Sequence, residues 1–149
     1  MIPILSIEEQ NCVYHALSLL ESKCEKHEFT SPDLAKNFFR LKLRARSQEV
    51  FATAYLDNKN MLIEYCEMFF GGIESATVCP RLVLRQALIL NASSMILAHN
   101  HPSGVVAPSS ADKQITKKIK EACDLMDIRL LDHIIVGEGA YSFAEYGEL

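Results

Sequence analysis

The hydrophobic and polar positions along the chain follow a helical period at first and change to another pattern partway along. Apolar side chains recur at helical spacing over residues 7–23, after a capping-box pattern formed by Ser6 and Glu9. A second helix is predicted over residues 31–46, because a Ser-Pro pair opens it. Together these helices form a predicted helical lead over residues 1–46.

Alternating strand and helix patterns then predict an α/β domain over residues 47–149. Two strands with a short turn between them form a predicted antiparallel hairpin. The hairpin is followed by a helix, a buried strand with a polar end, an amphipathic helix and two final strands. The predicted segments are 49–57, 61–72, 79–91, 93–101, 109–127, 129–137 and 140–147.

Composition narrows the class of protein. The 149 residues suit a domain with a full hydrophobic core, and the formal net charge of −4 weighs against a protein that coats nucleic acid. The sequence shows no signal peptide and no membrane span, and its five cysteines form no C-x-x-C pair. We therefore expect a cytoplasmic protein with reduced thiols.

Four cations lie late in the second predicted helix: Arg40, Lys42, Arg44 and Arg46. Cations stabilise the C-terminal end of a helix, and this is the interpretation we favour. A patch that binds nucleic acid is the alternative.

The stretch LAHNHPSGVVAPSSAD, residues 97–112, carries the candidate chemistry. Residues two apart on a strand point to one face, so His99 and His101 can reach one metal ion together. Asp112, in the first turn of the next helix, can supply a third ligand. The alternative is a strand end followed by a helix that Ser109 and Asp112 close with an S-x-x-D capping box. The two interpretations do not exclude each other, and the combination of residues favours the metal site.

The pattern H-x-H-P…S-x-x-D resembles the JAMM (MPN-plus) metalloprotease motif. The longer strings ILAHNHPSG…PS-x-AD and LLDHIIVG resemble the RadC family within it. The resemblance implies an α/β fold, a layered sandwich around a mixed sheet similar to that of cytidine deaminases. Full-length members of the family carry a helix-hairpin-helix region whose glycine-bearing hairpins this sequence lacks, so a short form is expected.

The resemblance also implies roles for individual residues. His99, His101 and Asp112 match zinc ligands, and Ser109 matches the serine beside the reacting water. Glu49 matches the distant glutamate that moves the proton. The local chemistry leaves three rivals open for that glutamate, namely Glu64, Glu67 and Glu74.

His133 lies within a predicted strand, with Asp132 on the opposite face. It can support a metal ligand from behind, but a histidine satisfied within the core is the interpretation we favour.

These observations predict an enzyme: a zinc-dependent hydrolase of amide bonds that acts on a peptide or isopeptide. A DNA-repair-associated DNA-binding protein or nuclease is one alternative, and nucleic acid is not the favoured partner. A non-catalytic metal-binding interaction module is the other. A nucleobase deaminase is excluded, because the sequence lacks H-x-E and P-C-x-x-C. The sequence leaves the substrate and the oligomeric state open.

Overall fold

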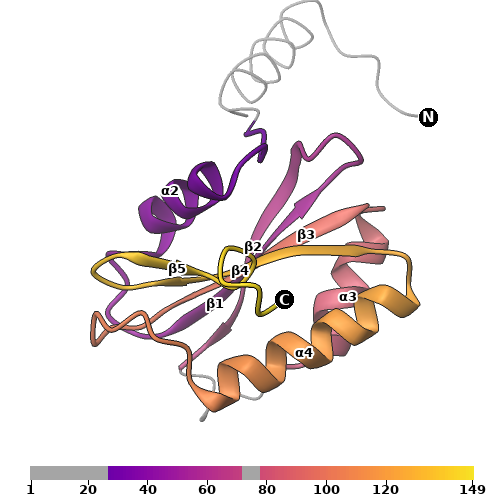
Figure 1. Cartoon of the computed structure of the whole chain (residues 1–149). Helices are drawn as coiled ribbons and strands as arrows, with labels where there is room; N and C mark the ends of the chain where they lie inside the picture. Colours follow the sequence, from indigo (N-terminus) through magenta and orange to yellow (C-terminus); the bar gives the residue numbers. More distant parts are fainter. Residues whose placement is uncertain (1–26, 72–77) are drawn as a thin grey trace, which may run out of the picture.

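The computed structural model describes residues 27–71 and 78–149 (Figure 1). The helix predicted over residues 7–23, with its capping box, and the rival glutamate Glu74 lie outside the described residues. The elements are α2 (Pro32–Leu43), β1 (Val50–Leu56), β2 (Leu62–Phe70), α3 (Pro80–Ile89), β3 (Ser94–Asn100), α4 (Ser110–Leu125), β4 (Arg129–Val136) and β5 (Ala140–Ser142).

The five strands form one sheet in the order β2-β1-β3-β4-β5. Strand β1 pairs antiparallel with β2 and β3, β3 pairs parallel with β4, and β4 pairs antiparallel with β5. Helix α2 covers one face of this mixed sheet, and α3 and α4 cover the other (Figure 1). The predicted α/β layered sandwich around a mixed sheet is therefore confirmed.

Side chains of the central strands alternate between two hydrophobic clusters. Phe51 and Tyr55 of β1 face α3 and α4, whereas Ala52 and Ala54 face α2. Every residue of β1 and β3 is buried, because helices cover both faces. The end of β3, where His99 and Asn100 lie, is therefore packed between the two helical layers.

Helix α2 begins as its sequence predicts, since Ser31 caps it and Pro32 occupies the first turn. It packs Phe39 and Leu43 against the sheet and ends at Leu43, three residues before the predicted end. The division of the chain at residues 46 and 47 into a lead and a catalytic domain stays a prediction.

The final predicted strand, residues 140–147, is too long. Strand β5 ends at Ser142, and the chain then turns. The buried Asp132 carboxylate holds this turn: it accepts hydrogen bonds from Ser142 Oγ at 2.5 Å and from Ala144 N at 3.0 Å. Those contacts replace the ladder that a longer strand would need.

Helices in the described part of the chain are too short or too polar to cross a membrane.

Candidate metal centre

Two imidazoles meet where β3 ends. His99 is fully buried on the α4 side of the sheet, and its Nε2 lies 2.9 Å from Nε2 of His101. A carboxylate oxygen of Glu49 completes a group whose ligand atoms all lie within 4.8 Å of one another. Glu49, His99 and His101 could therefore hold a metal ion.

Asp112 approaches the same imidazoles from the first turn of α4. Its Oδ1 lies 3.1 Å from His99 Nε2, and its Oδ2 lies 3.5 Å from His101 Nε2. Asp112 also forms the capping box, because Oδ2 accepts from Ser109 N at 2.7 Å while Ser109 Oγ accepts from Asp112 N at 3.1 Å. The cap and the approach to the histidines therefore occur together, and the cap fixes the direction of the carboxylate.

His133 is the residue whose role the sequence underestimated. It is fully buried beneath His99, with its Nε2 2.9 Å from His99 Nδ1 and its Nδ1 2.6 Å from Thr116 Oγ1. Rings of Phe51 and Phe143 pack against it. His133 is thus a core histidine and also the direct support of a proposed ligand.

The hydrogen bonds that link Thr116, His133 and His99 show which ring nitrogen of each histidine faces a donor or an acceptor. Thr116 Oγ1 donates its single hydrogen to the backbone oxygen of Asp112 at 2.6 Å, so it can only accept from His133 Nδ1–H. Burial holds the pKa of His133 well below its usual range, so the ring is neutral and its Nε2 is an acceptor. His99 must then donate from Nδ1, so that in the neutral ring the lone pair lies on Nε2.

A second backbone contact gives His101 the same tautomer. Its Nδ1 lies 2.7 Å from the carbonyl oxygen of Val105, which can only accept. In its neutral form, His101 therefore presents the lone pair of Nε2 toward Nε2 of His99, with the oxygens of Asp112 and Glu49 close by. Two imidazole nitrogens with neighbouring carboxylates form a ligand set that fits a divalent metal.

The charges of the Asp112 carboxylate and the two imidazoles are coupled. Burial alone would raise the pKa of Asp112, but the contacts with His101 and His99 outweigh it and hold that pKa well below its usual range. The contact with Asp112 in turn raises the pKa of His101, against the effect of burial. The cluster therefore favours a positive charge beside the Asp112 carboxylate.

Asn100 positions Glu49. Its buried side chain lies on the α2 side of the sheet, where Oδ1 accepts from Val50 N at 2.7 Å. Its Nδ2 donates to Gln48 O at 3.0 Å and to Arg46 O at 3.4 Å. The backbone on both sides of Glu49 is thus tied to the residue between the two histidines.

The rival glutamates on β2 are engaged elsewhere. Glu64 is exposed and accepts from the Cys66 thiol at 3.2 Å, and Glu67 pairs with Arg46 at 2.6 Å. Among the described residues, Glu49 is the glutamate that joins the histidine pair.

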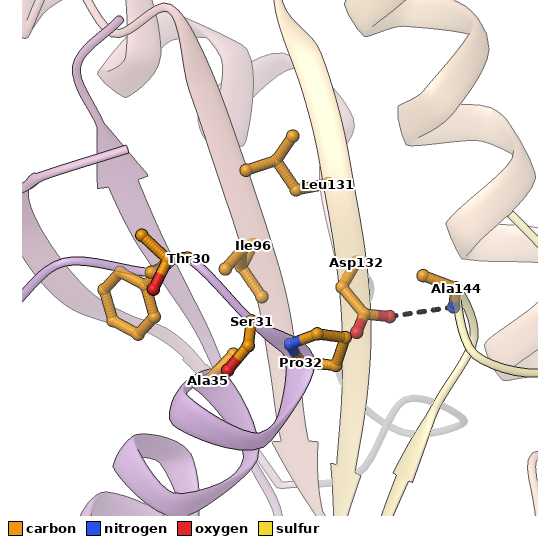
Figure 2. Close-up of a pocket in the computed structure, with 9 residues that line it drawn as sticks. Thr30, Ser31, Pro32, Ala35, Ile96, Leu131, Asp132 and Ala144 are labelled. Carbon is orange, nitrogen blue, oxygen red and sulfur yellow. Dashed lines mark hydrogen bonds between the residues drawn. The ribbon is translucent and has the colours of Figure 1, made fainter. Parts of the chain in front are cut away.

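Asp132 lies on the opposite face of β4 from His133, as the strand alternation predicts. It lines a separate hollow of about 130 Å³ between the start of α2 and strands β3 and β4 (Figure 2). Figure 2 shows its carboxylate bound to Ala144 N, and both of its oxygens have donors. Burial raises its pKa, against the effect of these hydrogen bonds. Asp132 therefore holds the turn after β5, on the face of the sheet away from the metal centre.

This combination of a mixed α/β sandwich and a histidine pair at a strand end defines a JAB-type domain. The sequence profile of the RadC-like JAB domain matches residues 29–148, so the chain belongs to that family. The resemblance to the RadC family is thereby confirmed.

Curated relatives agree with this assignment. A UPF0758 protein of Histophilus somni is 48% identical over 130 residues, which cover 87% of this chain and 59% of that protein. A UPF0758 protein of Aeromonas hydrophila is 50% identical over 121 residues, 80% of this chain and 54% of that protein. One from Vibrio cholerae is 43% identical over 143 residues, 95% of this chain and 91% of that protein. The chain thus spans little more than half of the first two relatives.

Proposed function

We propose that the chain is a zinc-dependent hydrolase of amide bonds, a metallopeptidase or isopeptidase. The observation that carries the proposal is the convergence of two imidazole lone pairs and two carboxylates at the end of β3. Nitrogen and carboxylate ligands suit zinc. Family membership supports the proposal, because JAMM-type domains are often hydrolases.

His99, His101 and Asp112 are the proposed zinc ligands. The tautomers of both imidazoles aim Nε2 at the centre, and the capping box holds Asp112. Zinc bound there would acidify water and polarise a carbonyl.

Glu49 is the proposed proton shuttle. It is half-buried at the start of β1, in reach of the histidines, while Asp112 is almost fully buried and fixed by its cap. A carboxylate with this access can take a proton from water and pass it to the leaving amine.

Ser109 is proposed to steady the reacting oxygen. Its Oγ accepts from Asp112 N, and its hydroxyl hydrogen has no acceptor within the described residues. That hydrogen can be donated to a substrate carbonyl oxygen.

The experiment is a screen of zinc-loaded protein against peptide and isopeptide pools, read by mass spectrometry. Glu49→Gln should retain zinc and lose about 10²–10⁴-fold in rate, the usual contribution of a positioned acid-base group. Glu64→Gln, the same change at an exposed position on β2, should keep full activity. Loss of zinc from Glu49→Gln would make Glu49 a ligand. Zinc binding without cleavage of any pool would favour the alternative of an interaction module.

A further inference from the structure

Two of the four cations near the end of α2 form no side-chain contact within the described residues. Lys42 Nζ lies 5.6 Å from the ring centroids of Phe38 and Tyr65. Arg46 pairs with Glu67 at 2.6 Å. Across residues 27–71 and 78–149, the guanidinium groups of Arg40 and Arg44 contact no partner.

Arg44 lines a polar hollow of about 250 Å³ that His101 also lines. The walls come from the end of α2, with Arg44 and Arg46, and from the loop after β3, with His101 and Gly104. Glu138, after β4, lies on another wall. A molecule in this hollow would therefore contact one of the proposed zinc ligands.

Contacts of Arg46 tie the chain just after Arg44 to the strands that carry the metal centre. Asn100 Nδ2 donates to the backbone oxygen of Arg46, and Glu67 holds the Arg46 side chain from β2. Arg44 also lines a neighbouring hollow of about 320 Å³ on α2, together with Arg40. Like charges four residues apart on a helix repel each other, so an anion between Arg40 and Arg44 would relieve a local cost.

We propose that the hollow lined by Arg44 and His101 is a subsite for a carboxylate of the substrate. Arg44 is then the residue that selects an acidic side chain next to the scissile bond. The inference rests on the proposed function, since it names a preference of the same centre. A guanidinium matches one carboxylate with two parallel hydrogen bonds. A carboxylate of a peptide is preferred to a phosphate of a nucleic acid because the proposed substrate of the neighbouring centre is a peptide or isopeptide, and the oligonucleotide probe below tests the alternative.

Equilibrium binding tests the subsite without requiring cleavage. Zinc-loaded full-length protein is titrated into a fluorescent pool of random peptides with a fixed Glu-Asp pair, and into a matched pool with Gln-Asn. Binding is measured by anisotropy. The acidic pool should bind more tightly, and Arg44→Gln should weaken it about tenfold, as expected for the loss of a charged hydrogen-bonded pair. Arg85→Gln removes the same charge from an exposed site on α3, across the sheet, and should change nothing.

Equal binding of the two pools, or equal effects of Arg44→Gln and Arg85→Gln, would overturn the proposal. A labelled single-stranded oligonucleotide is the third probe. If it bound more tightly than the acidic pool and lost affinity in Arg44→Gln, the occupant would be a phosphate backbone, and the carboxylate subsite would be wrong. Hydrolysis of the same pools, followed separately by mass spectrometry, reports on the proposed function alone.

Discussion

His133→Phe is expected to weaken zinc binding although residue 133 is not a proposed ligand. Phenylalanine keeps an aromatic ring between Phe51 and Phe143 but removes both nitrogen contacts of the histidine. His99 Nδ1–H then loses its acceptor in a fully buried site.

Two responses are open to His99, and both oppose metal binding. It can keep its tautomer, at a cost of about 1–3 kcal/mol for a buried donor without an acceptor. It can instead move its proton to Nε2 and donate to Asp112 Oδ1, 3.1 Å away, which removes the lone pair from the centre. The expected loss of zinc affinity is about 10–100-fold, the usual effect of removing a group that orients a ligand.

Competition with a fluorescent zinc chelator measures this affinity. Ile134→Val is the control for lost stability, because it alters a buried neighbour on the opposite face of β4 and costs about 0.5–1.5 kcal/mol. Thr116→Val, which removes only the hydroxyl that fixes the His133 tautomer, should produce a smaller loss of affinity. Wild-type affinity in His133→Phe would refute the proton assignment.

Two further predictions concern stability. Asn100→Ala removes three hydrogen bonds to the backbone around Glu49, so the free energy of unfolding in urea should fall by about 2–4 kcal/mol. An unchanged urea midpoint would mean that Asn100 does not hold the backbone beside Glu49. Burial raises the pKa of the Asp132 carboxyl group in the folded protein above its unfolded value of about 4. The protonated carboxyl group therefore contributes fully to stability below about pH 4, and this contribution is lost as the pH rises through the pKa of the folded protein. Asp132→Asn should therefore gain stability relative to the wild type between pH 4 and pH 7, and a constant difference across that range would contradict this.

The histidine pair and Asp112 are predictable from sequence because their geometry is local. Strand alternation sets the face of His99 and His101, and the capping box sets the direction of Asp112. The α/β sandwich follows from the order of the elements and from the family resemblance.

The role of His133 depends on register, which the sequence does not specify. The parallel pairing of β3 with β4 shifts by one residue between Met95 and Ile96, so His133 pairs with Leu97 and faces α4. Without that shift Asp132 would face the metal centre instead. The contacts of Asn100 and Arg44 likewise depend on the return of the chain from α2 to β1, which no local pattern encodes.

Zinc stoichiometry shows whether the two histidines at the end of β3 form a metal centre. The wild-type protein is supplied with zinc, dialysed and measured by elemental analysis beside a His99→Ala/His101→Ala variant. A Cys66→Ser/Cys79→Ser variant controls for zinc held by half-buried thiols. We expect about one zinc per chain in the wild type and in the cysteine variant, and none in the histidine variant. Absence of zinc from the wild type, or zinc retained without the two histidines, would contradict it.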